Sequence, residues 1–280
     1  MVRDREGGQS VVVIIALIDN GSIEAAAHLN LRVVAAALGS RVAQPVVAVS
    51  WRHSDRIPAA LLGGHAAQTL RPWLQSALAG GEHTFLFVPF FVSAQGAIGS
   101  SLLTELEALK RQFGAFDFSF TEGLAARDAI VPIVTTRVRE CIRAQGLRTP
   151  SVIVVDHGGP SPASAALRND LADRIRVELG TEIGPLAAAS MEGAEHPHNR
   201  PLLAEQLAHP GFNTGDVVIA PLFLSPGRHA GAEGDLAQIA IASEAKAAAP
   251  LRCHFTELIG THPHAIEVLF SAVRENLDRR

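Results

Sequence analysis

Short apolar segments rich in β-branched and aromatic residues alternate along the chain with longer segments in which Ala and Leu recur at helical spacing. In the first half the short segments predict strands over Val11–Ile18, Val46–Ser50, Phe85–Phe91 and Ala115–Thr121. The longer segments predict helices over Ser22–Leu38, Ala59–Leu78, Ser101–Phe113 and Ala126–Ala144. Strands that are apolar on both faces and alternate with helices are typical of a parallel sheet covered on both sides.

The second half repeats this alternation. Strands are predicted over Val152–Val155, Ala187–Met191, Val217–Phe223 and Leu251–Leu258. Helices are predicted over Ser161–Leu179, Arg200–His209, Gly234–Ala248 and His262–Leu277. We therefore predict an α/β protein of two tandem, similar four-stranded parallel-sheet domains with helices on both faces. Pro150 marks the seam, which places the domains at residues 1–148 and 149–280, and 280 residues suit two domains of about 150 each.

Three short sequence matches support an internal duplication. IALIDNGS at 15–22 corresponds to VVDHGG at 154–159, so that Asp19 lies opposite Asp156. VPFFVS at 88–93 corresponds to APLFLS at 220–225, and FTE at 120–122 recurs at 255–257. The three matches occur in the same order at offsets of 137, 132 and 135 residues, which indicates that one unit was copied.

Composition excludes several classes of protein. The chain is 48% hydrophobic and carries a net charge of −4, so it has material for a core and lacks the composition of a disordered chain. No basic excess is present, and we expect no nucleic-acid partner. The two cysteines, Cys141 and Cys253, form no CxxC motif, which argues against a disulfide framework or a thiolate zinc site.

Apolar stretches and sequence motifs also predict the location of the protein and whether it binds a nucleotide. The longest apolar stretch, Val11–Ile18, has eight residues, whereas a helix that crosses a membrane needs about 20. No cleavable signal is recognised at the N-terminus, so the expected location is the cytoplasm. The chain has no GxGxxG or GxxxxGK[ST] motif, and we expect no nucleotide cofactor.

Candidate chemistry lies at the carboxyl ends of three second-half strands. His157 follows the first, Glu192 follows the second, and His229 lies in the loop after the third. Because carboxyl ends of parallel strands meet at one sheet edge, these side chains are expected to converge there. Imidazole and carboxylate together suit a first-row divalent metal. The alternative interpretation is that both histidines are ordinary polar residues of loops.

The first half has the same frame without these groups. Asn20 stands opposite His157, and Trp51-Arg52 stands opposite Met191-Glu192. Ala97 stands opposite His229 when Ser93 is aligned with Ser225. One metal site per chain is therefore expected.

The second half resembles the sirohydrochlorin chelatases. The segments that carry the resemblance are VVDHGG at 154–159, APLFLSPGRHAGAEGDL at 220–236 and FTELIGTHP at 255–263. These class II tetrapyrrole chelatases act in siroheme or cobalamin biosynthesis, where they insert a divalent metal into sirohydrochlorin. The resemblance implies a lyase whose substrates are Co²⁺, Fe²⁺ or Ni²⁺ and a modified tetrapyrrole, with cobalt slightly preferred. It also implies a tetrapyrrole bound between an active half and a degenerate half.

The resemblance assigns residues as well. It implies that His157 and His229 bind the metal and accept protons, and that Glu192 assists them. Two departures stand beside it: HGG replaces the commoner HGS, and the segment EHPHN follows Glu192. Arg228 is a candidate for binding carboxylates of the tetrapyrrole, because guanidinium presents a planar fork to them.

Several other residues, and the function itself, allow alternative interpretations. His196 and His198 either bind or deliver metal or belong to a surface loop. Asp235 reads as a charge favoured at a helix N-terminus, and His262 as a helix cap. A hydrolase is disfavoured because no GxSxG motif is present. A metal- or tetrapyrrole-binding protein without turnover is the alternative function, and the oligomeric state is not predicted.

Overall fold

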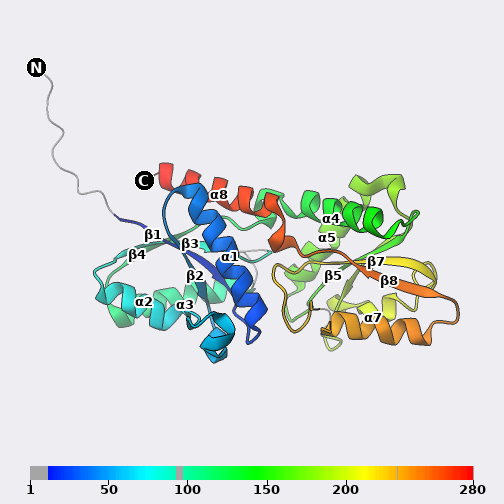
Figure 1. The fold of residues 1–280 in the computed structure, drawn as a ribbon, viewed down its shortest axis with the longest axis horizontal. Coiled ribbons are helices and arrows are strands. Elements are labelled where there is room, and N and C mark those ends of the chain that lie inside the picture. The colour runs from blue at the N-terminus through cyan, green and yellow to red at the C-terminus, as the bar shows by residue number, and fades with distance from the viewer. Residues whose placement is uncertain (1–11, 93–96, 232, 280) are drawn as a thin grey trace, which may run out of the picture.

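Two parallel sheets of the same topology form the framework of the computed structural model, which describes residues 12–92, 97–231 and 233–279 (Figure 1). In the first sheet the order is β2 (Val46–Ser50), β1 (Ile14–Asp19), β3 (Thr84–Pro89) and β4 (Asp117–Phe120). In the second it is β6 (Leu186–Ser190), β5 (Ser151–Asp156), β7 (Gly215–Pro221) and β8 (Leu251–Phe255). Every strand pair is parallel, which confirms the predicted α/β architecture of two similar four-stranded sheets.

Helices cover both faces of each sheet. They are α1 (Ala25–Val42), α2 (Leu70–Ala79), α3 (Ala97–Phe113), α4 (Ile130–Gln145), α5 (Pro162–Leu179), α6 (Leu203–Gln206), α7 (Asp235–Lys246) and α8 (Pro263–Asp278). Side chains of a strand point alternately to its two faces, so Ile15 and Leu17 of β1 join one core while Ala16 and Ile18 join another. No helix in the described part of the chain combines the length and the apolarity needed to cross a membrane.

The last helix of each half packs against the other half. In Figure 1, α8 (red) lies along α1, and α4 (green) lies beside α5 over the second sheet. Arg127 of the first half donates to both carboxylate oxygens of Glu275 in α8, at 2.9 and 2.6 Å. Arg139 of α4 donates in turn to Glu182 of the second half at 3.0 Å. One apolar core therefore runs through both halves, built from α1 and α8 beside β1 and from α4 and α5 beside β5.

Two predicted helices differ from the structure. The helix predicted over Ala59–Leu78 is wrong as a single element, because a 3₁₀ turn at Ala59–Leu62 is followed by Gly63 and Gly64 with φ of 71° and 86°. These left-handed conformations end the turn, and α2 begins at Leu70. Of the helix predicted over Arg200–His209, only the single turn of α6 is helical. Val11 and Ser93, which entered the predicted strand and the repeat alignment, lie outside the described residues.

The two halves differ in a buried polar cluster beneath the strand ends. In the second half, Ser190 Oγ donates to Asp156 Oδ1 at 2.6 Å, and the guanidinium of Arg168, only 2% exposed, donates to both residues. In the first half, the serine at the matching position, Ser50, is hydrogen-bonded to Asp19 and contacts the neutral ring of His28, whose Nδ1 lies 3.2 Å from its Oγ. The first cluster therefore has no guanidinium to neutralise its carboxylate.

Burial consequently perturbs both titratable groups of the first-half cluster. Desolvation raises the pKa of Asp19 from 3.8 to about 6, against hydrogen bonds from Ser50 and the backbone. Desolvation, helped by the charge of Arg32, lowers the pKa of His28 from 6.5 to about 4. Asp19 Oδ1 and His28 Nε2 are buried and find no hydrogen-bond partner among the residues that the structure describes.

We predict that Asp19→Asn stabilises the protein at alkaline pH. Folded Asp19 binds its proton more tightly than the unfolded chain does, so its contribution to the free energy of unfolding is lost as pH rises from about 4 through 6. A pKa raised from 3.8 to about 6 corresponds to about 3 kcal/mol. Urea unfolding at pH 8 should show the variant more stable by up to that amount, with the difference vanishing towards pH 4.

The matched control is Asp156→Asn, which changes the equivalent carboxylate in the second half. This substitution leaves the buried charge of Arg168 without its anion, which destabilises a protein by about 3–5 kcal/mol. Equivalent positions of the repeat should therefore respond with opposite signs. Destabilisation of both variants at pH 8 would contradict the assignment of Asp19 as an uncompensated buried carboxylate.

Candidate functional site

Two histidines meet at the carboxyl edge of the second sheet. His157 directly follows β5, and His229 lies in the loop that follows β7. Their Nε2 atoms are 3.3 Å apart, with ring centroids 4.7 Å apart and ring planes at 84°. Both side chains are partly exposed, and the structure brings them together where the strand order placed them.

The partners of the other ring nitrogens define the tautomers. His157 Nδ1 lies 3.1 Å from the carbonyl oxygen of Gly158, and His229 Nδ1 lies 2.6 Å from Asp235 Oδ2. Both oxygens accept hydrogen bonds only, so each Nδ1 carries a proton and donates it. In the neutral rings, both Nε2 atoms therefore carry lone pairs, and the two nitrogens lie 3.3 Å apart with the rings in a T-shaped arrangement.

Such a pair of lone pairs is suited to a cation. At 3.3 Å, two unprotonated nitrogens repel each other unless a positive charge lies between them. Two nitrogens bound to one tetrahedral ion at about 2.1 Å are separated by about 3.4 Å, which follows from the bond length and the tetrahedral angle. The observed separation is close to the one expected for two ligands of a single ion.

Glu192, at the end of β6, borders this pair. Its Oε1 lies 3.5 Å from His157 Nε2, and its side chain is 56% exposed. No three His, Cys, Asp or Glu side chains of the described residues converge closely enough to hold an ion together. The two histidines are therefore prearranged, whereas Glu192 has to move to join them.

A close contact of the backbone holds the His157 loop against the Glu192 loop. Glu192 N donates to His157 O at 3.1 Å, and Met191 N donates to Asp156 O at 2.8 Å. Gly158 has φ of 84°, and a Cβ atom there would lie 2.1 Å from Glu192 O. Only glycine fits this position, which explains the residue after His157.

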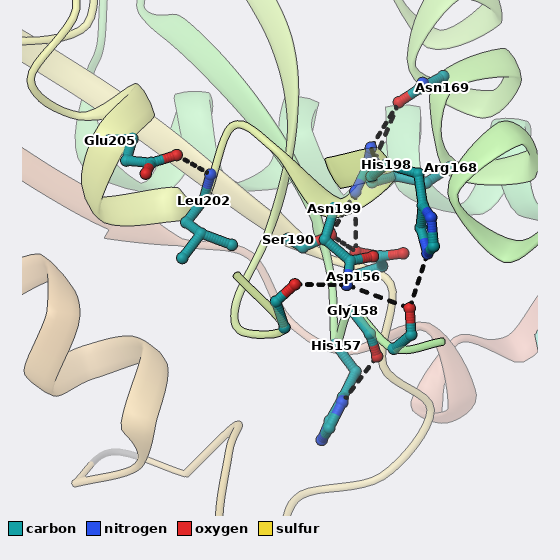
Figure 2. A network of polar contacts seen from close by, with 12 residues as sticks. Asp156, His157, Gly158, Arg168, Asn169, Ser190, His198, Asn199, Leu202 and Glu205 are labelled. Carbon is teal, nitrogen blue, oxygen red and sulfur yellow. Dashed lines mark hydrogen bonds and ion pairs between the residues drawn. The ribbon is translucent and has the colours of Figure 1, made fainter. Parts of the chain in front are cut away.

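The polar cluster of Asp156, Arg168 and Ser190 lies beneath the loop, and Figure 2 shows the His157 ring turned away from it. The next loop adds bonds, because Asn199 Nδ2 donates to Gly159 O at 3.1 Å and to Gly193 O at 2.9 Å. His198 Nε2 donates to Gly159 O at 2.9 Å, so His198 braces the loop. Sequence reasoning missed Arg168 and Asn199, since a buried arginine in the middle of a helix and an asparagine in a loop carry no distinctive pattern.

A cavity of about 800 Å³ opens beside His157. It is lined by His157, Gly158, Gly159, Pro160, Met191, Glu192, Gly193, Ala194, Glu195, His196 and Leu202. His196 thus lines the cavity, with its ring stacked on that of His198 at 5.4 Å. Arg228 lies beside His229 and is highly exposed, with its Nε 3.6 Å from Asp235 Oδ2.

The first half reproduces the backbone of this site with other side chains. Trp51 N donates to Asp19 O at 2.8 Å and Arg52 N to Asn20 O at 3.2 Å, as Met191 and Glu192 do in the second half. Asn20 and Arg52 therefore occupy the positions of His157 and Glu192, as the alignment predicted. The side chain of Ala97, aligned with His229, lies outside the described part of the structure.

Two residues at helix starts have different roles. His262 Nδ1 accepts a hydrogen bond from His264 N at 3.1 Å, which confirms that it caps α8. Asp235 is the first residue of α7, as expected, but its carboxylate also contacts His229. Sequence reasoning missed this contact, although the six-residue spacing from His229 across a glycine-rich loop was visible.

The second half of the chain is similar in sequence to a known protein family. Residues 151–276 match the family model CbiX. No curated protein matches the chain significantly.

Solved structures match nearly the whole chain at low sequence identity. SirB from Bacillus subtilis with Fe³⁺ is 13% identical, with a TM-score of 0.66, over 96% of this chain and 98% of that one. SirB from Bacillus subtilis subspecies spizizenii in complex with cobalt is 13% identical, with a TM-score of 0.68, over 95% and 96%.

A third structure is described as CbiX, the terminal enzyme for biosynthesis of siroheme in denitrifying bacteria. It is 15% identical, with a TM-score of 0.60, over 94% of this chain and 98% of that one. Residues 151–276 are therefore similar in sequence to the CbiX family, and the chain as a whole shares the fold of these SirB and CbiX structures.

Proposed function

We propose that the protein is a chelatase that inserts a divalent metal ion into sirohydrochlorin. The observation that carries the proposal is the approach of His157 Nε2 and His229 Nε2 to 3.3 Å, with each Nδ1 engaged by an acceptor. His157 of this pair lines a cavity of about 800 Å³. In this proposal the metal ion is a substrate that enters and leaves.

Insertion exchanges one divalent ion for two protons. The macrocycle loses its two pyrrole N–H protons, and the ion takes their place on the ring nitrogens, so the total charge is conserved. As the ion passes to the macrocycle, the Nε2 lone pairs of His157 and His229 become free. Those lone pairs then accept the pyrrole protons and later release them to water, because imidazole changes charge readily near neutral pH.

Glu192 and Arg228 have separate roles in this proposal. The carboxylate of Glu192 moves towards His157 to assist in holding the ion or in removing a proton. Arg228 extends from the loop of His229 and binds a carboxylate of the tetrapyrrole, for which the guanidinium fork is suited. His196, on the cavity wall, lies where an entering ion would pass.

The donor set defines the class of metal. Two imidazoles and a carboxylate accept Fe²⁺, Co²⁺ and Ni²⁺, and the supply of metal in the cell then selects among them. We propose Co²⁺ or Fe²⁺ as the physiological substrate, with the product used in cobalamin or siroheme biosynthesis. SirB structures that share the fold are described with cobalt and with Fe³⁺.

The two halves of the chain have different roles in this proposal. Residues 149–280 form the active domain, and residues 1–148 form a degenerate copy that carries Asn20 and Arg52 where the active copy has His157 and Glu192. In this proposal the tetrapyrrole binds between the two, because the loop that carries His229 is in contact with the first half. Asn30 of α1 donates to Ser225 Oγ in that loop at 2.9 Å.

We predict that His157→Ala and His229→Ala each lower turnover by at least about 100-fold, since each removes one ligand and one proton acceptor. The fold should survive, because both rings are partly exposed and contribute little to the core. Turnover is measured from the absorbance change when sirohydrochlorin is incubated with Co²⁺ and protein.

Asn20→Ala is the matched control, since it truncates the equivalent side chain of the first half. Its turnover should stay close to that of the unmodified protein, and a loss as large as that of His157→Ala would refute a single site in the second half. If the unmodified protein binds sirohydrochlorin stoichiometrically without exceeding the spontaneous rate of insertion, it is a carrier and the enzymatic proposal fails.

We predict that Arg228→Ala raises KM for sirohydrochlorin roughly tenfold with little change in kcat, since one charged hydrogen bond contributes about 1.5–3 kcal/mol. Arg252→Ala is the control. Arg252 is comparably exposed but pairs with Asp216, near the opposite edge of the sheet, at 2.8 Å. Equal changes in KM for the two variants would show that only overall charge matters.

A further inference from the structure

We propose that Asp235 is a positioning residue that keeps the ring of His229 in the tautomer and orientation in which Nε2 faces His157. This inference rests on the proposed function, because it concerns the residue that would hold the incoming metal ion. Neither the sequence nor the family match assigned this role to Asp235. The carrying observation is the 2.6 Å contact between His229 Nδ1 and Asp235 Oδ2.

The loop and the start of α7 form one closed unit around this contact. Asp235 N donates to Arg228 O and Leu236 N donates to His229 O, both at 3.2 Å. The backbone of the helix start therefore holds the backbone of His229, while the Asp235 side chain holds its ring.

Close packing makes this unit rigid. A Cβ atom on Gly234 would lie 2.8 Å from Arg228 O and 2.9 Å from the carbonyl carbon of His229, so only glycine fits between the loop and the helix. Leu236 and Ala240 of α7 are buried in the core on the outer face of the second sheet. The packed helix α7 thus fixes the position of the His229 ring.

The two histidines are held by different kinds of partner. His157 Nδ1 donates to a backbone carbonyl, which no substitution removes, whereas His229 Nδ1 donates to a side chain. A carboxylate can only accept from Nδ1, so it excludes the tautomer in which a proton sits on Nε2. Metal-binding histidines are commonly oriented in this way, and loss of the orienting group typically costs 10–100-fold in metal affinity.

The decisive variant is Asp235→Asn. Its amide group is similar in size but carries no charge to stabilise a proton on Nδ1, and it can present its NH₂ to Nδ1, in which case the ring carries its proton on Nε2, towards the ion. We expect the Kd for Co²⁺ to rise 10–100-fold, measured by calorimetry and by the visible absorption of bound Co²⁺ in the full-length protein. Asp235→Glu, which retains an acceptor that excludes this tautomer, should recover part of the affinity.

Glu233→Gln is the matched control, because it removes one exposed negative charge at the same helix start. Its Kd for Co²⁺ should remain that of the unmodified protein. An unchanged Kd in Asp235→Asn would overturn the proposal, and so would an equal loss in Glu233→Gln, which would assign the effect to helix charge.

A second measurement needs no variant. The nitrogen chemical shifts of the His229 ring at pH 8, from ¹H–¹⁵N NMR of the unmodified protein, should show the proton on Nδ1. A proton on Nε2 would overturn the proposal even if Asp235→Asn failed to fold. Absence of chelatase turnover would refute the proposed function alone, since metal affinity and tautomer are read independently of turnover.

Discussion

The apolar core shared by the two halves is the constraint on which the site depends. Ile15 and Leu17 of β1 belong to the same core as Val152 and Val154 of β5, because α8 returns to the first half and α4 crosses to the second. Neither half can move without exposing this surface. The loop that carries His229 is held from the first half as well, through the bond from Asn30 to Ser225 Oγ. The first half is therefore structural support for the candidate site.

The two copies of the repeat share their backbone framework and differ in the side chains around it. Both halves keep an aspartate at the end of the first strand, a serine at the end of the second, and a left-handed glycine, with φ of 85° at Gly21 and 84° at Gly158. The second half adds Arg168, which neutralises Asp156 and leaves the strand ends rigid beneath His157. The first half has no such cation at Asp19, and burial raises the pKa of that carboxylate instead. The carboxylate neutralised by Arg168 lies under His157, whereas the carboxylate with the raised pKa lies under Asn20.

Periodicity was sufficient for the strands and for the edge at which His157, Glu192 and His229 lie. It could not show the exchange of α4 and α8, since the apolar stripe of a helix is the same whichever sheet it covers. The interruption of the predicted helix at Gly63 and Gly64 was missed, because the residues on both sides of the two glycines have helical spacing. Arg168 and Asp235 were missed for a different reason: their roles are hydrogen bonds across loops, and the residue type at one position does not encode the direction of a side chain.

The incomplete convergence of the site suits a metal that is a substrate. His157 and His229 would supply two ligands, and Glu192, 3.5 Å from His157 Nε2, lies outside bonding contact with a common point among the described residues. A third or fourth ligand already in place would raise the affinity for the ion and slow its release, as in structural zinc sites that are closed by four ligands. Two ligands fixed through their Nδ1 hydrogen bonds orient an ion without enclosing it. His157 and Glu192 also line the cavity, which would give a macrocycle access to an ion held at this edge.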